Sequence, residues 1–160
     1  YILGLQKKTK KNILDIGSGC GYFPFICEHF GHTVSAIDID TDPMFNELID
    51  FLNVKRTTYE IQPYKQLPLL SKKFDFVTGF MVCFNGHTTP QLWTANEWDF
   101  FLRDLANNQC NPNAEFYFTL NAERDTGLWY TEELKEYFLE MGAEVDDERF
   151  YFNNISKFIG

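Results

Sequence analysis

Three glycines follow the first stretch of the chain that has the composition of a buried strand. In the segment ILDIGSGCGYFPF, Gly17, Gly19 and Gly21 remove side chains where a backbone must turn sharply and approach a ligand. Asp15 offers a carboxylate just before these glycines, and Asp38 ends the next apolar run. A carboxylate in the second position can accept both hydroxyl hydrogens of a ribose. These residues predict a site for a nucleoside-containing cofactor.

The spacing of the glycines separates two classes of cofactor. The dinucleotide fingerprint GxGxxG needs a glycine at position 22, so that a helix N-terminus can meet a pyrophosphate. Tyr22 occupies that position, and the spacing is GxGxG instead. An acid two residues ahead suits a cationic cofactor without phosphate. The pattern therefore disfavours a nicotinamide-dependent oxidoreductase.

The elements that position these residues alternate between strand and helix patterns. Between the strands, apolar residues at helical spacing predict helices, of which the later three are capped by Asp42, Asn96 and Thr131. Such alternation predicts an α/β fold with a doubly wound, mostly parallel sheet and helices on both faces. The expected strands span residues 12–16, 33–37, 57–61, 74–80 and 115–120.

The end of the chain has a different pattern. Residues 144–152 and 155–159 are two strand candidates with no helix between them, and Asn153 and Asn154 separate them. Two short strands joined by such a pair predict a C-terminal antiparallel hairpin. We expect one domain over residues 1–160, and because the chain starts at Tyr1 rather than methionine, we expect it to be part of a longer product.

Three segments in order resemble the motifs of class I (Rossmann-like) S-adenosylmethionine-dependent methyltransferases. They are the GxGxG turn, AIDID at the end of the second strand, and KFDFVTGF in the fourth, and the resemblance runs from about Asn12 to the chain end. It implies that S-adenosyl-L-methionine is the cofactor. It also implies that Asp15 lies near the methionine ammonium, Asp38 binds the ribose, and Ile39 flanks the adenine. The turn under the cofactor would comprise Gly17, Ser18, Gly19, Cys20 and Gly21, with Gly79 and Phe80 beside the sulfonium.

The sequence departs from the family pattern in two places. Where the family often has an acid after the third strand, this chain offers Gln62, Pro63 and Tyr64, and we expect Tyr64 to stack on the adenine instead. The Asp/Asn-Pro-Pro-Tyr/Phe motif of many amino-group methyltransferases is replaced by VCFNGH. This replacement argues against DNA adenine or protein glutamine as the acceptor.

Methyl transfer is an in-line displacement, so positioning supplies much of the rate and a base is needed only for a protonated nucleophile. His87 follows the fourth strand, near the expected acceptor, and is the candidate catalytic base. Asn85, Glu97 and Trp98 are the candidate groups for orienting the acceptor.

Charge and composition narrow the partners. The chain has 23 acidic against 14 basic residues and a net charge of -9, a balance that repels a phosphate backbone. We therefore expect a small-molecule acceptor rather than nucleic acid. No apolar run reaches the ~20 residues of a membrane-spanning helix. The four cysteines show no CxxC pair, so we expect free thiols, no metal site and a cytoplasmic location.

Two functions remain open on the sequence. The leading hypothesis is an enzyme, an S-adenosylmethionine-dependent methyltransferase with a small-molecule acceptor. The alternative is a catalytically inactive methyltransferase-like subunit with a binding or regulatory role, because the acid after the third strand is missing.

Overall fold

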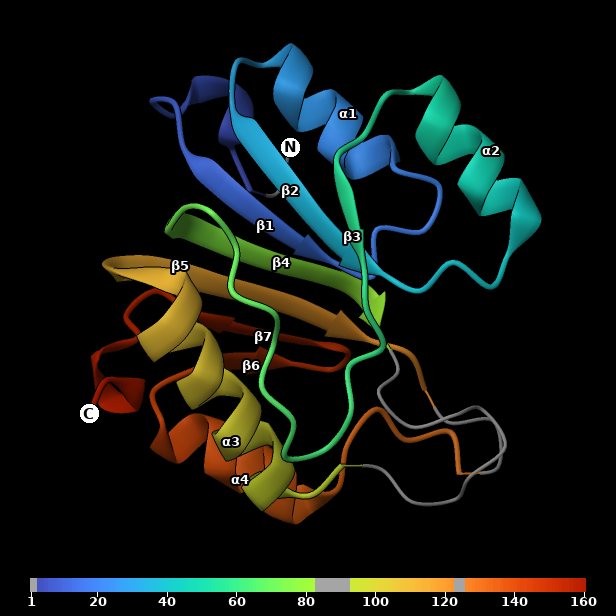
Figure 1. Cartoon of the computed structure of the whole chain (residues 1–160). Coiled ribbons are helices and arrows are strands. Elements are labelled where there is room, and N and C mark those ends of the chain that lie inside the picture. Colours follow the sequence, from blue (N-terminus) through green and yellow to red (C-terminus); the bar gives the residue numbers. More distant parts are fainter. Residues whose placement is uncertain (1–2, 83–92, 123–125) are drawn as a thin grey trace.

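A seven-stranded sheet forms the centre of the molecule (Figure 1). The computed structural model describes residues 3–82, 93–122 and 126–160. In chain order the elements are η1 (Leu5–Lys7), β1 (Asn12–Ile16), α1 (Tyr22–His29), β2 (Thr33–Asp38), α2 (Pro43–Phe51), β3 (Arg56–Thr58), β4 (Phe74–Val82), α3 (Ala95–Asp104), η2 (Leu105–Gln109), β5 (Cys110–Leu120), α4 (Glu132–Glu140), β6 (Glu144–Asp146), β7 (Arg149–Phe152) and η3 (Ser156–Phe158).

The strand order is β3-β2-β1-β4-β5-β7-β6, and the first five strands run parallel. β7 pairs antiparallel with β5, and β6 pairs antiparallel with β7. The chain moves outward from β1 to β3 and then returns to the other side of β1, so the order reverses between β1 and β4. Ligands of doubly wound sheets bind at the carboxyl ends of the strands at such a reversal. The predicted fold class is confirmed.

Helices cover both faces of the sheet. Figure 1 shows α1 and α2 on one face and α3 and α4 on the other. The larger core lies under α3 and α4 and is rich in aromatic rings, with Phe138 stacked on Phe150 at a centroid distance of 4.1 Å. Trp98 lies edge-on to both rings. Packed aromatic pairs of this kind stabilise a core beyond the area that they bury.

Two of the predicted helix caps are confirmed. The Asp42 carboxylate accepts a hydrogen bond from the Met44 amide at 2.9 Å, and Pro43 opens α2. The Thr131 hydroxyl caps α4. The prediction for α3 was wrong, because Thr94 rather than Asn96 caps it. Glu97 accepts hydrogen bonds from the backbone N–H and the hydroxyl of Thr94. This is a capping box, in which the threonine and the glutamate of the segment TANE are three residues apart.

The predicted hairpin has the wrong boundaries. The turn lies at residues 147–148, between β6 and β7. The second strand candidate, residues 155–159, contains the 3-10 turn η3 (Ser156–Phe158) instead of a strand. Ile155 and Phe158 are both fully buried, and their i, i+3 spacing places them on one side of a helical turn. Asn154 opens this turn by accepting a hydrogen bond from the Ser156 amide. The third strand is also shorter than predicted, because it ends at Thr58.

In the first helix the apolar residues Phe23, Ile26, Cys27 and Phe30 stand at i, i+3, i+4 and i+7, a spacing that predicts one shared core-facing side. Pro24 and Cys27 face the core, whereas Ile26 and Phe30 are about half exposed. The helix is thus rotated about its axis relative to the apolar pattern. Among the described helices, none combines the length and apolar character that crossing a bilayer requires.

Phe138→Ala should lower the free energy of unfolding by about 3 to 5 kcal/mol, because it leaves a cavity in the aromatic core. Phe51 is 85% exposed on α2 and provides the matched control. Phe51→Ala should change stability by less than about 0.5 kcal/mol. Urea denaturation of the two variants measures both values, and equal losses would contradict the assigned core.

Candidate cofactor-binding site

The turn from β1 to α1 passes three times through the left-handed region of backbone space. Gly17, Gly19 and Gly21 have φ angles of 71°, 50° and 78°. The Gly17 amide donates a hydrogen bond to the carbonyl of Ile37 in β2 at 2.8 Å, which fixes the start of the turn. Because side chains with a Cβ disfavour this region, the glycines are required by the path of the backbone.

Two of these glycines also lie close to neighbouring side chains. A Cβ on Gly21 would lie 2.8 Å from Cδ1 of Ile49 in α2, and one on Gly17 would lie 3.1 Å from Cγ1 of Val82 in β4. Gly19 differs, because the nearest neighbour of its Cβ position is Phe45 at 3.9 Å. The backbone at Gly19 therefore has space beside it that a ligand could approach.

Asp38 lies at the end of β2 with its carboxylate fixed by the turn. The Gly19 amide donates to Oδ2 at 2.7 Å, and the Ile39 amide donates to Oδ1 at 2.8 Å. The Ser18 hydroxyl lies 3.5 Å from Oδ2. An ionised carboxylate offers about four acceptor positions, so both oxygens keep capacity for a ligand's hydroxyl groups.

Asp15 is a buried carboxyl in β1, the strand next to the one that ends in Asp38. Only 2% of the residue is exposed, and the Thr78 hydroxyl donates to its Oδ1 at 2.7 Å. Burial raises the pKa of Asp15 to about 7; the Thr78 hydrogen bond opposes this rise, and the charge of Asp38 adds to it. A cation bound nearby would favour the ionised form.

Gly79 and Phe80, predicted beside the sulfonium, face different surroundings. Gly79 pairs with Ile16 at the carboxyl end of β1, and a Cβ there would lie 2.6 Å from the ring of Phe118. The Phe80 ring instead packs against Phe23 of α1, with a centroid distance of 4.7 Å. Gly79 therefore joins the edge that carries the glycine turn, whereas Phe80 fills the space between the sheet and α1.

The other predicted cofactor residues differ in how the structure places them. Ile39 is 46% exposed directly after Asp38, and Cys20 is a half-buried free thiol in the turn. Tyr64 is 57% exposed, and its ring lies edge-on to Phe100 of α3 at 5.8 Å. Tyr64 thus contacts α3, and none of its described contacts joins it to the turn.

Of the residues proposed to act on the acceptor, His87 and Asn85 lie outside the described residues. Glu97 is engaged in the cap of α3. Trp98 is only 3% exposed and packs in the aromatic core, so its proposed role in orienting an acceptor was wrong. Trp98 lies on the same face of α3 as the buried residues Phe101 and Leu102, so its ring points into the core.

Sequence reasoning missed Thr78 and Val82. Thr78 pairs with Asp15 in the parallel register, and this pairing brings its hydroxyl to the buried carboxyl. A threonine within the apolar strand of KFDFVTGF was the available signal. Val82 packs against two glycines, for which the sequence offered no signal.

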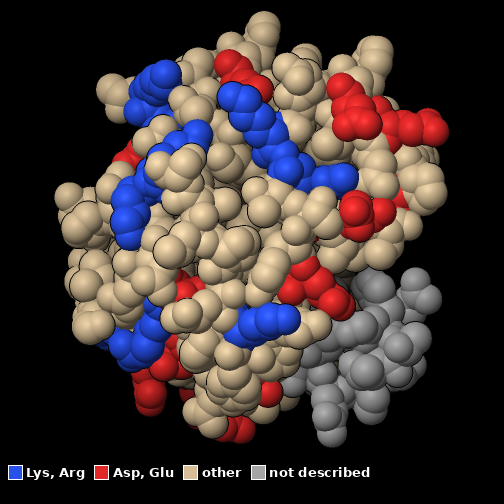
Figure 2. All heavy atoms as spheres, in the orientation of Figure 1, with Lys and Arg blue, Asp and Glu red and all other residues tan. Residues whose placement is uncertain are grey.

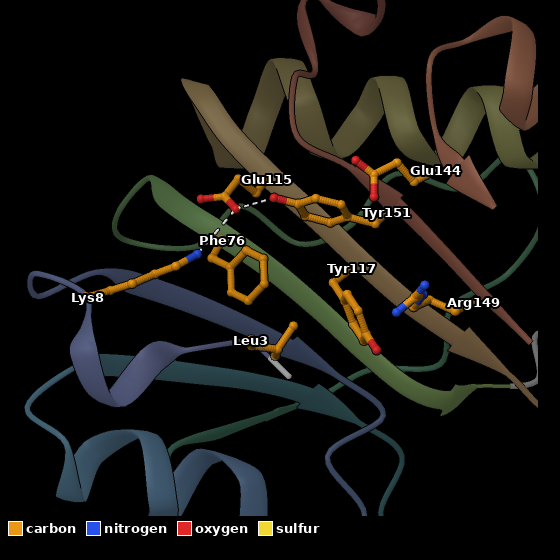
Figure 3. A pocket seen from close by; sticks show the side chains of 8 residues that line it. All are labelled: Leu3, Lys8, Phe76, Glu115, Tyr117, Glu144, Arg149 and Tyr151. Atoms are coloured by element: carbon orange, nitrogen blue, oxygen red, sulfur yellow. Dashed lines mark hydrogen bonds and ion pairs between the residues drawn. The ribbon is translucent and has the colours of Figure 1, made fainter. Parts of the chain in front are cut away.

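A hollow of about 240 Å³ lies elsewhere, against β4, β5 and β7. Figure 3 shows the Tyr151 hydroxyl and the Lys8 side chain directed at the Glu115 carboxylate on one side of this hollow. Glu115 accepts hydrogen bonds from Lys11 Nζ and from the Tyr151 hydroxyl, each at 2.6 Å, and pairs with Lys8. None of the predicted cofactor residues lines this hollow, and its central carboxylate is already satisfied by neighbouring side chains.

Comparisons with known proteins support the fold assignment. No protein-family model and no curated protein matches this chain in sequence. DesVI of Streptomyces venezuelae is similar in structure, with a TM-score of 0.60, 12% identity, and coverage of 92% of this chain and 85% of that chain. A protein described as a putative methyltransferase, from Bacillus halodurans, has a TM-score of 0.58 and 16% identity, and the match covers 91% of this chain and 69% of that chain. The ribosomal protein L11 methylase from Lactobacillus delbrueckii subsp. bulgaricus has a TM-score of 0.56 and 14% identity, and the match covers 94% of this chain and 73% of that chain. The chain therefore has the class I methyltransferase fold.

Asp15→Asn should remove a pH dependence from the stability of the protein. The folded pKa of Asp15 is raised from 3.8 to about 7, so between these values the folded state binds more protons than the unfolded state. Its contribution to stability is therefore present below about pH 4 and is lost as the pH rises to 7. The free energy of unfolding of Asp15→Asn, minus that of wild type, should rise over this range by a few kcal/mol, to order of magnitude.

Urea denaturation at pH 5 and pH 8 measures this difference. Asp50→Asn makes the same charge change on the exposed surface of α2 and serves as the control. A difference for Asp15→Asn that stays constant with pH would show that Asp15 is not the titrating group.

Proposed function

We propose that this chain, which has the class I methyltransferase fold, binds S-adenosyl-L-methionine and transfers its methyl group to a small-molecule acceptor. The observation that carries the proposal is the Asp38 carboxylate. It is fixed by the Gly19 and Ile39 amides at the carboxyl edge of the sheet and keeps free acceptor capacity there.

The residues of this edge fit the parts of the cofactor. Asp38 would accept the two ribose hydroxyls, and the exposed Ile39 would lie against the adenine. Asp15 would face the methionine ammonium. The positive charge of that group would favour the ionised form of the Asp15 carboxyl, whose pKa is raised to about 7 by burial. The open space at Gly19 allows the cofactor to approach the backbone. When bound, the cofactor supplies a methyl group on a positively charged sulfur.

Tyr22 supports this cofactor over a nicotinamide dinucleotide. It is the first residue of α1 and is 57% exposed, directly after the left-handed Gly21. The dinucleotide fingerprint has a glycine in its place, which allows the helix to pack closely against the strand. Two carboxyls at the same edge would also oppose a dianionic pyrophosphate and favour a cation.

For the acceptor, we retain His87 as the proposed general base. Its neutral imidazole would take a proton from the acceptor while the methyl group arrives. On the face drawn in Figure 2, the basic and acidic side chains of the described residues are interspersed, without a continuous basic surface for a nucleic acid. This distribution and the net charge of -9 favour a small-molecule acceptor. The free thiols of Cys20, Cys27 and Cys110 fit a reducing compartment, and we propose the cytoplasm.

The second candidate is a methyltransferase-like subunit without catalytic activity. The sequence pattern favours it, because Gln62, Pro63 and Tyr64 follow the predicted third strand where an acid often contacts the adenine amine. In the structure β3 ends at Thr58, so the acid Glu60 also lies in the segment after it, where it accepts a hydrogen bond from Gln62 at 3.1 Å. Such a subunit would bind the cofactor and transfer nothing. Binding and turnover must therefore be measured separately.

Asp38→Ala should weaken binding of S-adenosylhomocysteine by about 10- to 150-fold. The ribose hydroxyls would lose a charged acceptor, a contact worth about 1.5 to 3 kcal/mol. Asp40→Ala removes the same charge from an exposed position two residues away and should bind normally. Calorimetric titration measures both affinities, and equal losses would mean that charge alone, not the ribose contact, is responsible.

Turnover is tested by incubating the protein with radiolabelled S-adenosylmethionine and pools of small-molecule acceptors. Wild type should label a product, whereas Asp38→Ala should label far less at the same cofactor concentration. Cofactor binding without any labelled product would favour the regulatory subunit. Absence of both binding and label would overturn the proposal.

A further inference from the structure

We infer that Thr119 and Asn121, at the end of β5, are positioning residues for the cofactor site. They hold Met81 of β4 in a left-handed conformation, and this conformation sets Val82 against the glycine turn. The inference rests on the proposed function, because its consequence is a change in cofactor affinity.

Met81 has an unusual backbone conformation. Its φ angle is 55°, a region that residues with a side chain larger than Asn or Asp rarely adopt. Its side chain is 67% exposed, so burial of the thioether does not enforce this conformation. Strained residues of this kind persist only where the surrounding structure fixes them.

The fixing groups are two side chains from the neighbouring strand end. The Met81 amide donates a hydrogen bond to Thr119 Oγ1 at 2.8 Å, and Asn121 Nδ2 donates to the Met81 carbonyl at 2.5 Å. Both backbone polar groups of Met81 are thus bound by side chains rather than by a strand ladder. The β4–β5 register shifts between Gly79 and Val82, as expected where one residue bulges from a strand.

The bulge determines where Val82 lies. The backbone N–H of Asn121 donates a hydrogen bond to the Val82 carbonyl at 3.1 Å, and Val82 is only 8% exposed. Val82 Cγ1 lies 3.1 Å from the Cβ position of Gly17 and 3.2 Å from that of Gly79. Its side chain therefore packs between Gly17 of the turn and Gly79 of β4. A change in the bulge would move Val82 and, through it, Gly17.

Thr119→Val tests this coupling with little change in shape. It removes the acceptor of the Met81 amide, and we expect the affinity for S-adenosylhomocysteine to fall about 5-fold, the effect of roughly one hydrogen bond. Thr131→Val is the matched control, because the Thr131 hydroxyl also accepts from a backbone amide, that of Leu134 in the cap of α4. It should lower the melting temperature and leave the affinity unchanged.

A rescue separates positioning from general destabilisation. Glycine adopts the left-handed region freely, so Met81→Gly should reduce the need for the two side chains. In the Met81→Gly background, Thr119→Val should change the affinity less than 2-fold, which a double-mutant cycle measures. If Thr119→Val does not fold, Asn121→Ala takes its place in the same cycle.

The amide resonance of Gly17 in the ligand-free protein provides a readout that does not depend on the proposed function. It should shift in Thr119→Val and return toward its original position when Met81→Gly is added. If wild type does not bind S-adenosylhomocysteine, the proposed function fails while this shift still tests the coupling. Unchanged affinity together with an unchanged Gly17 resonance would overturn the inference.

Discussion

The structure depends on close packing around two glycines of the turn between β1 and α1, Gly17 and Gly21. At Gly17 and Gly21 a Cβ would lie within about 3 Å of atoms in β4 and α2, and both residues have left-handed φ angles. Only glycine meets both conditions. As a result β1, β4 and α2 can approach one another at the carboxyl edge of the sheet. The same turn brings the Gly19 amide to Asp38 and so fixes the carboxylate at the end of β2.

The two carboxyls at this edge have different roles because their surroundings differ. Asp38 is bound by two amides and is half-buried, so it offers acceptor positions for hydroxyl groups. Asp15 is buried beside it with one hydroxyl partner, and burial raises its pKa to about 7. A bound cation would lower the free-energy cost of ionising Asp15 in its buried position. Without a cation, that cost reduces the stability of the folded protein as the pH rises to 7. Such sites commonly exchange stability for ligand binding.

The sequence predicts features that depend on local chemistry. The α/β alternation, the Asp42 cap and the glycine turn follow from residues within a few positions of one another, and the structure has all three. Features that depend on distant neighbours were wrong or missed. The partnership of Asp15 with Thr78 requires the register of β1 and β4, which no local pattern specifies. Ile155 and Phe158 appear strand-like in sequence, and only the core that they fill makes them part of a helical turn.

We propose that this edge of the sheet binds a cationic nucleoside cofactor and not a dinucleotide. The most direct test of this proposal is calorimetric titration of the purified chain at pH 8, with S-adenosylmethionine in one experiment and NAD in the other. We expect saturable binding of one S-adenosylmethionine per chain and no measurable heat of binding for NAD. Binding of NAD with equal or greater affinity, or binding of neither compound, would contradict it.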